Sequence, residues 1–595
     1  MLLPRVLPYG QVRTIQLFGL FLTLTTLILV MRLYSRPPPE RYEYTEGRTS
    51  PWHDWKNTTV ATSDEVAYLG FLADTYGLTR EVPWFARRIR TKYSAARRLS
   101  MTEVPAKFLS RDFRRVRPDD EYLELQAEKA LTLPFARSPR PDDIDASRLL
   151  FGVSTTAARL AYANYSLVRD YERWLTDGRG ASNGATLLLA LQATKAEAVR
   201  VGRMLLDRGI DAVVVDESPG RDAAARYAEL LGRLHRHNQD LTRADPAAAK
   251  HFLALVDDDV FFPSLARLLA KLARFRPDDE FYIGAPSEKS GDWVVLDKDK
   301  DKDDKDDDDD DDDDDADPAA TRTTANETLT TYGGGAVFLT PPMAARLAAL
   351  PCLRGPAPDD DADAGGARPW DEHLYRCVAA GTDADFHVLP SFYAPTDDAA
   401  YGAAGAANAG YGGGLQPLTL HHYRTWHRFD AGRGHQVTAA CGEDGFLQRF
   451  RFRDDWVLVN GYTLSQYPDG VEAVPLRKAP ADVPAEAPAG RLRKGKKAAG
   501  SSTAAQRVVV APRLVVDSGD RPADMKAIAW RGPKRTWRLL DSRVTPAGEV
   551  WQAYVKRKGQ ANSYGDVGEW TPGDAVHTEE GPSNEDSVIV LIWEP

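Results

Sequence analysis

Three consecutive aspartates, Asp257, Asp258 and Asp259, have side chains and spacing that could do chemistry. They follow the apolar run HFLALV (251–256) and precede Val-Phe-Phe, a pattern typical of a buried strand that delivers side chains to a sheet edge. Carboxylate oxygens suit Mg²⁺ or Mn²⁺, and such a cation can neutralise a diphosphate leaving group. Bringing three carboxylates together costs electrostatic free energy unless a cation or a strong hydrogen-bond donor compensates their repulsion. We therefore predict a divalent-cation site here, the alternative being three solvated loop acids.

Alternating apolar and helix-compatible segments surround these aspartates. Short apolar runs begin near residues 147, 185, 210 and 251, and the segments between them carry apolar residues at helical spacing. This order predicts an α/β fold with a mainly parallel sheet flanked by helices. Ligands of such sheets gather at the carboxyl ends of the strands, where the aspartates lie.

Composition narrows the class of protein. The 595 residues are 43% hydrophobic and 27% charged, enough for a large folded body with appendages. Three cysteines without a CxxC pair exclude a disulfide-dense scaffold and zinc-ribbon sites. Sixteen Asp and four Lys within 297–317 give a local charge of −12, so the remaining residues sum to +1 against the total of −11. A nearly neutral body indicates no nucleic-acid partner.

The acidic run at 297–317 is predicted to be a disordered, solvated insertion, because charges this dense repel one another and nothing apolar anchors them. Calcium capture is the alternative, although the glycine and terminal Glu of an EF-hand are missing. A low-complexity linker is expected at 471–505, and alternating segments after it indicate a β-rich C-terminal portion. Residues 40–146 are expected to contain helical pieces rich in Arg and aromatics.

Eighteen residues without a charge, 14–31, lie between Arg13 and Arg32. As a helix they would be about 27 Å long, close to the thickness of a bilayer. No small-residue cleavage site follows, so we predict an uncleaved signal-anchor, the alternative being a buried helix. Because arginines flank the stretch on both sides, the positive-inside rule gives only a weak prediction of its orientation in the membrane. N-x-S/T sequons at Asn57, Asn164 and Asn326 favour a lumenal body.

Seven motifs occur in one order along the chain: LLFGVSTTAARL, LVDDDVFF, FYIGAPSE, YGGGAVFLT, RPWDEHLYRCVAAGT, PLTLHHYRTWH, and CGEDGFLQRFRF with NGY. In these the chain resembles the fringe-like β1,3-glycosyltransferases, most closely their fungal type II membrane branch. The resemblance covers about residues 147–465, and DSVIVLIW more loosely. It implies a GT-A fold, a UDP-sugar donor, a glycan or glycoprotein acceptor, Mn²⁺ or another divalent cation, and inversion at the anomeric carbon. It also implies a Golgi (or ER) membrane protein, single-pass type II, with a lumenal body.

The resemblance assigns roles to particular residues. Asp259 and His421 match the metal ligands, with His422 the alternative because the motif is doubled, and Asp371 matches the catalytic base. The plain alternatives are a packed core histidine and a helix N-cap aspartate. Donor contacts are implied or expected for Asp257, Asp258, Thr155, Arg159, Gly333, Gly334 and Gly335. Arg159 could instead be a helix-surface charge, and the three glycines an ordinary tight turn. Trp370 and Trp426 could stack on a sugar or belong to the core.

Two other functions fit parts of the sequence. Haloacid-dehalogenase-like phosphatases place Asp-x-Asp-x-Val after an apolar strand, but they also need a downstream Lys and a second acidic pair in the α/β core. A lumenal glycan-binding or scaffold protein on the same fold, without turnover, is the second alternative.

The predicted organisation is a cytoplasmic tail (1–13), a transmembrane signal-anchor (14–31), a stem and N-terminal lumenal region (32–146), a catalytic domain (147–470) with its insertion (297–317), the linker (471–505) and the β-rich C-terminal portion (506–595).

Overall fold

The computed structural model describes residues 63–95, 97–217, 222–285, 294–296, 326–328, 335–353, 369–389, 392–393, 416–424, 429–475, 514–516, 526–530, 534–558 and 584–595. Among these residues, no helix is long and apolar enough to cross a bilayer. The predicted span at 14–31 and the acidic run at 297–317 lie outside them.

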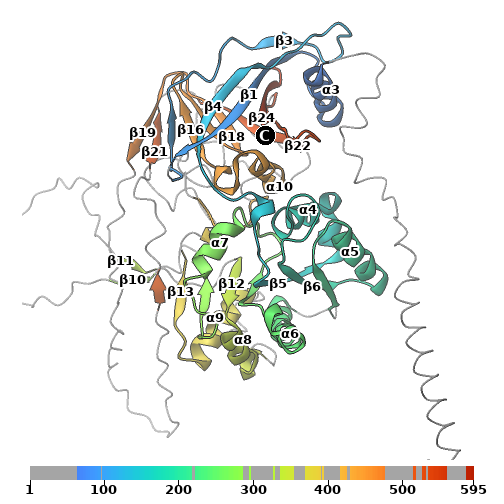
Figure 1. The fold of residues 1–595 in the computed structure, drawn as a ribbon, viewed down its shortest axis with the longest axis vertical. Helices are drawn as coiled ribbons and strands as arrows, with labels where there is room; N and C mark the ends of the chain where they lie inside the picture. Colours follow the sequence, from blue (N-terminus) through green and yellow to red (C-terminus); the bar gives the residue numbers. More distant parts are fainter. Residues whose placement is uncertain are drawn as a thin grey trace, which may run out of the picture. The chain divides into compact units, whose positions relative to one another are not determined.

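A mixed sheet of eight strands organises the middle of the chain, counting described residues only (Figure 1). Its spatial order is β20-β13-β9-β12-β8-β5-β6-β7. Only β12 runs antiparallel to its neighbours in this described sheet, which confirms the predicted α/β class. The strands are β5 (Leu149–Thr156), β6 (Thr186–Gln192), β7 (Ala212–Asp216), β8 (Phe252–Val256), β9 (Tyr282–Gly284), β12 (Ala336–Leu339), β13 (Phe386–Val388) and β20 (Leu514–Val516).

Alternate residues of the central strands pack against two different groups of helices, as the period of two requires. Phe151 and Val153 of β5 belong to the core that contains α4 (Ala157–Leu175), α5 (Lys195–Asp207) and α7 (Leu265–Leu272). Leu150 belongs to the core formed with α6 (Ala223–Ala244), α8 (Pro341–Ala348) and α9 (Trp370–Gly381). Gly152 allows α6 to pack closely, since a Cβ there would lie 2.7 Å from Leu234 Cδ1. The sheet is therefore covered by helices on both faces.

A second sheet, of ten strands within the described residues, combines segments that precede the α/β part with segments from residue 449 onward. Its strands come from three stretches: β1 (Val82–Ala95), β2 (Thr102–Val104), β3 (Arg114–Val116) and β4 (Glu128–Ala136); β16 (Arg449–Phe452), β17 (Trp456–Val459) and β18 (Thr463–Gln466); and β22 (Arg535–Val544), β23 (Val550–Lys556) and β24 (Ser587–Glu594). β24 pairs in parallel with β1. The predicted N-terminal region and the β-rich C-terminal portion thus share one sheet, while their boundaries stay predictions.

The helical pieces expected in residues 40–146 are largely wrong. Among the described residues of this stretch, the one α-helix is α3 (Asp64–Tyr76), and the longest element is strand β1. The Arg- and aromatic-rich sequence of β1 is held extended by three partners, β3, β4 and β24. Pairing with such distant residues overrides local propensity.

Glu443 of the CGEDGF motif joins the segment before β16 to helix α7. Its carboxylate accepts hydrogen bonds from the Ser264 hydroxyl (2.7 Å) and from the backbone N–H groups of Leu265 (3.3 Å) and Ala266 (3.1 Å). It therefore caps the helix that follows the aspartate loop. Only 4% of Glu443 is exposed, and this burial raises its pKa from 4.5 to about 7 despite the hydrogen bonds.

We predict that Glu443 makes folding pH-dependent. Between pH 4.5 and about 7 the folded state holds a proton that the unfolded state has lost. The free energy of unfolding should therefore fall as the pH rises through this window and level off above it. Glu443→Gln should remove that part of the slope. Urea unfolding of both proteins at pH 5 and pH 8 measures it, and an unchanged slope in the variant would contradict the assignment.

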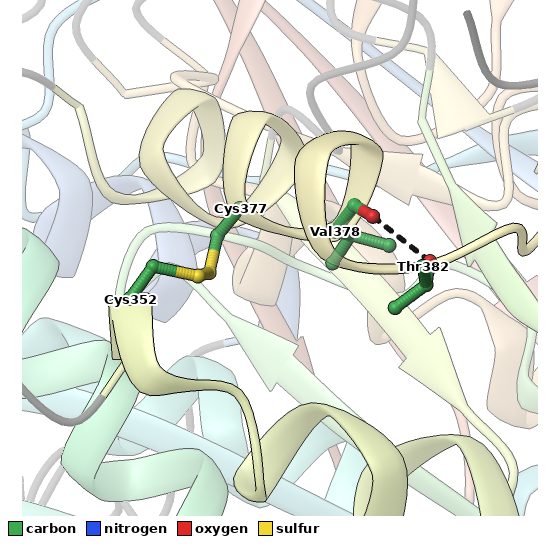
Figure 2. Close-up of a disulfide and its surroundings, with 4 residues drawn as sticks. All are labelled: Cys352, Cys377, Val378 and Thr382. Carbon is green, nitrogen blue, oxygen red and sulfur yellow. Dashed lines mark hydrogen bonds between the residues drawn. A yellow bond between two sulfur atoms is a disulfide. The ribbon is translucent and has the colours of Figure 1, made fainter. Parts of the chain in front are cut away.

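A disulfide joins Cys352 and Cys377, a pairing that the sequence leaves open. Figure 2 shows it linking the short 3-10 turn Pro351–Leu353 to the middle of α9. One turn further along, the Thr382 hydroxyl donates to the Val378 carbonyl at 2.8 Å and closes the end of the helix (Figure 2). Cys441 is buried and lies outside the pair. The disulfide fixes α9 to the segment that follows α8.

Removing the disulfide should lower stability measurably. It closes a chain separation of 25 residues, for which the loss of loop-closure entropy in the unfolded chain is worth about 3 kcal/mol. Cys352→Ser combined with Cys377→Ser should lower the free energy of unfolding by this amount. Urea unfolding measures the loss as a shift of the transition to lower urea concentration. A reducing agent should produce a similar shift in the wild type and none in the double variant. Equal stability with and without the disulfide would count against its structural role.

Candidate metal and donor site

Asp257, Asp258 and Asp259 directly follow β8, at the carboxyl end of the strand. The chain runs outward from β5 to β6 and β7, and then returns to the other side of β5 as β8. The strand order thus reverses between β5 and β8, which is the place where ligands of such sheets bind. Thr155, near the carboxyl end of β5, contacts the same loop. The predicted location of the aspartates at a sheet edge is confirmed.

Asp258 is tied to β5 and to the start of α4. Its Oδ2 accepts from the Thr155 hydroxyl at 2.5 Å and lies 2.6 Å from Arg159 Nε. The Tyr171 hydroxyl donates to the backbone carbonyl of Asp258 at 2.9 Å. Burial raises the pKa of Asp258, although Arg159 and Thr155 oppose this shift. Thr155 and Arg159, expected to contact a donor, therefore contact the aspartate loop itself.

Asp259 lies between two histidines and an arginine. His421 Nε2 is 3.3 Å from its Oδ1, whereas His422 Nδ1 (3.1 Å) and Arg159 Nη2 (3.3 Å) approach its Oδ2. Burial works against ionisation, but the two neighbouring imidazoles outweigh it and hold the pKa of Asp259 well below its usual range. The carboxylate is thus ionised and can act as a metal ligand.

The segment around the two histidines is anchored on both sides. Before it, the backbones of Phe261 and Leu420 exchange two hydrogen bonds of 2.9 and 2.8 Å. After it, the Tyr423 hydroxyl and the Arg424 guanidinium both bind Oδ2 of the buried Asp170 of α4, each at 2.5 Å. These contacts bring residues 421–424 against the aspartate loop.

The His421 and His422 rings stack with centroids 3.8 Å apart, and His422 has a left-handed backbone with φ of 50°. Ligand atoms of Asp259, His421 and His422 all lie within 4.8 Å of one another. One carboxylate and two imidazoles fit Mn²⁺ or a similar divalent ion. The structure brings both members of the doubled histidine motif to Asp259, so sequence position alone does not choose between them.

Gly335 packs directly against the histidine. Its φ is +77°, and a Cβ there would lie 3.0 Å from both His421 Cγ and Val260 Cγ2. Its carbonyl accepts from the Asp257 backbone N–H at 2.9 Å. This glycine therefore belongs to the wall of the site rather than to an ordinary solvent-exposed turn. Gly333 and Gly334 lie outside the described residues.

Helix α9 begins beside Asp257. Its N-cap is Pro369, and Asp371 lies in the first turn, half-buried, so the alternative that Asp371 is the N-cap residue is wrong. Pro369 has an extended backbone (φ −55°, ψ 146°), as an N-cap residue requires, and the cap lies two residues earlier than the acidic pattern indicates. Trp370 is buried against the Tyr227 ring instead of open to a sugar, and its indole N–H donates to Asp257 Oδ1 at 2.7 Å. Trp426 lies outside the described residues.

Tyr227 is the site residue that the sequence did not indicate. It lies in the second turn of α6, and its hydroxyl is 3.1 Å from Asp257 Oδ1 and 2.9 Å from the Val256 carbonyl. A tyrosine in an Ala-rich helix carries no local signal of such a contact. Only the packing of α6 on β8 reveals it.

Gly335→Ala should weaken divalent-cation binding. The added methyl group must displace His421 or Val260, and the positive φ adds strain of about 1 kcal/mol or more. We expect at least a tenfold loss of Mn²⁺ affinity by calorimetric titration. Gly470→Ala is the matched control, because Gly470 also has a positive φ but no atom lies within 4 Å of the position that its new methyl group would occupy. If both variants lost the same Mn²⁺ affinity, backbone strain alone would explain the loss, and contact with His421 would not be needed.

No protein-family model matches this chain, and no curated protein matches it. Among solved structures, it is similar to the apo form of mouse xyloside xylosyltransferase 1, with 15% identity, 46% of this chain and 96% of that chain covered, and a TM-score of 0.24. It is also similar to the mannosyltransferase PcManGT from Pyrobaculum calidifontis in complex with GDP-Man and Mn²⁺, with 18% identity, 26% and 39% covered, and a TM-score of 0.16. A glycosyltransferase involved in glycosylation of the major capsid of PBCV-1 has 9% identity, 46% and 93% covered, and a TM-score of 0.20. TM-scores this low identify neither a family nor an activity for this chain.

Proposed function

We propose that this protein is a metal-dependent inverting glycosyltransferase of the fringe-like type. It would move a sugar from a UDP-sugar to a hydroxyl of a glycan or glycoprotein acceptor, in β1,3 linkage. The observation that carries the proposal is the meeting of Asp259 with His421 and His422 at the point where the strand order reverses. These residues come from two of the seven motifs on which the family resemblance rests.

Asp259 and His421 would hold the cation, and Mn²⁺ suits their mixed oxygen and nitrogen donors. When bound, the cation stabilises the charge that develops on the departing nucleoside diphosphate. Arg159, whose side chain is 54% exposed beside Asp258 and Asp259, adds a fixed positive charge at the same edge. Asp371 would take the proton from the acceptor hydroxyl as that oxygen attacks the anomeric carbon. Inversion then needs no covalent intermediate.

The proposed location is the Golgi (or ER) membrane, with residues 14–31 as a single type II anchor and the body in the lumen. The Cys352–Cys377 disulfide supports an oxidising compartment, because disulfides are rare in the cytosol. Asn164 of the second sequon is exposed, which also suits a lumenal body. The similarities to a mannosyltransferase and a xylosyltransferase do not identify the sugar that this protein would transfer.

The phosphatase alternative fits less well. It requires a lysine and a second acidic pair near the first aspartate, whereas the described side chains that contact Asp257 are Tyr227, Trp370 and His421. A glycan-binding protein without turnover remains the alternative function. Incubating the full-length protein with a panel of UDP-sugars and Mn²⁺ separates the two. Metal-dependent release of UDP supports a transferase, whereas UDP binding without release from any sugar supports the binding protein.

Asp371→Asn should lower turnover at least about a hundredfold and leave the donor site intact. Asn keeps the shape of the side chain but cannot take the acceptor proton, and loss of a general base typically costs a hundredfold or more, about 2.7 kcal/mol in activation free energy. UDP affinity should stay within about threefold of wild type. Glu372→Gln, on the same helical turn and ion-paired with Arg376 at 2.8 Å, is the control and should keep most of the activity. Normal turnover of Asp371→Asn would place the base elsewhere.

A further inference from the structure

Helix α4 contains a left-handed turn that separates two helical segments. Tyr162 has an extended backbone (φ −56°, ψ 142°), and the three residues after it, Ala163, Asn164 and Tyr165, have φ values of 48°, 53° and 56°. Residues other than glycine rarely adopt this conformation, and asparagine is among those that tolerate it best. Three such residues in succession form a strained turn that its surroundings must hold.

Contacts on one side hold this turn. The Arg169 guanidinium donates to the carbonyls of Asn164 and of the residue before it, at 2.5 and 3.3 Å. Tyr165 packs against the hydrophobic core, and Ser166 is buried, with 3% exposure. On the other side Asn164 is exposed, and the Tyr162 ring is 61% exposed. The turn therefore presents an asparagine and a tyrosine to solvent from a fixed backbone.

Asn164, Tyr165 and Ser166 form an acceptor triplet for N-linked glycosylation. Such modification adds a bulky, hydrated group, so the asparagine must lie on the surface of the folded protein. Asn164 meets this requirement on a turn. Of the other two sequons, Asn57 lies outside the described residues, and Asn326 begins the short strand β11 (Asn326–Thr328).

We propose that Asn164 carries an N-linked glycan and that the first sugar of this glycan packs on the Tyr162 ring. The donor is an oligosaccharide carried on a polyprenyl diphosphate. The Asn164 amide nitrogen bonds to C1 of the first N-acetylglucosamine and loses one proton, while the bond from C1 to the diphosphate oxygen breaks and the polyprenyl diphosphate leaves. Because Ser166 is buried once α4 has packed, the transfer takes place on the nascent chain.

The position of Tyr162 suits contact with the attached sugar. The two Cα atoms are two residues apart and therefore at most about 7 Å from each other, which the two side chains can span. An aromatic ring offers an apolar face to the apolar face of a sugar and keeps its hydroxyl in water. Such a contact would stabilise the turn between the α4 segment that carries Arg159 and the segment that carries Asp170. The inference goes beyond sugar transfer and rests on the proposed lumenal location.

The first test is peptide mapping of the full-length protein produced in insect cells. Trypsin cleavage after Arg159 and Arg169 releases residues 160–169, a peptide that contains no other sequon. Peptide N-glycosidase in heavy-oxygen water converts a glycosylated asparagine to a mass-labelled aspartate. We expect the label in this peptide from the wild type. Asn164→Gln and Ser166→Ala should each abolish it, one by removing the acceptor and the other by removing the hydroxyl of the triplet.

The second test is urea unfolding of the detergent-solubilised protein before and after removal of the glycan. Removal should raise the unfolding equilibrium constant about fivefold, the size of one aromatic contact. Asn164→Asp is the matched reference, because the glycosidase leaves aspartate and aspartate also tolerates the left-handed backbone. In Tyr162→Ala the same removal should change the constant less than twofold. Tyr122→Ala, which removes another exposed ring (90%), should keep the full effect.

The outcomes separate the parts of the proposal. An unlabelled 160–169 peptide beside labelled Asn57 or Asn326 would overturn the Asn164 site and leave the lumenal location intact. Absence of label at all three sequons would overturn both, and UDP release from a UDP-sugar tests the transferase independently of either. A labelled Asn164 with the same fivefold effect in Tyr162→Ala would overturn the contact between the sugar and the ring.

Discussion

Carboxylates packed at the end of a buried strand need compensation, and much of the described structure around them supplies it. The backbone after β8 places three aspartates within one turn, where their mutual repulsion would otherwise oppose folding. α4 contributes Arg159, α6 contributes Tyr227, α9 contributes Trp370, and a segment more than 160 residues later contributes the histidines. Each helix is thereby held at one end of the sheet by a polar contact as well as by its apolar face.

The second sheet supports the same place from a distance. Phe135, Phe450 and Trp593 of its strands pack edge to face, and they share one continuous core with Phe151 and Trp174 of the α/β part. Glu443 extends this connection to the N-terminus of α7, immediately after the aspartate loop. Packing therefore connects the β-rich part with the α/β part that carries the site.

Local patterns predict the α/β part well, because strand, helix and aspartate loop follow one another within about a hundred residues. They predict the β-rich part poorly, since β1 is an extended strand only beside β24, which lies about 500 residues away. The same difference holds in the site. Asp257, Asp258 and Asp259 are visible as a motif, whereas the contacts of Asp257 with Tyr227 and Trp370 depend on how two helices pack. The cap of α9 also falls at Pro369 rather than Asp371, a matter of backbone geometry that residue type alone does not determine.

The parallel pairing of β1 with β24 has a consequence for biosynthesis. Residues Ser587–Glu594 are synthesised about 500 residues after β1, so β1 waits for this neighbour while all of the intervening chain is made. During that time an Arg-rich strand with an unpaired edge is exposed to chaperones and to other nascent chains. A message truncated before the codons for β24 would yield a chain whose α/β core is encoded in full but whose first long strand has lost a partner. Quality control would then act on the segment around β1 for a defect encoded about 500 residues later.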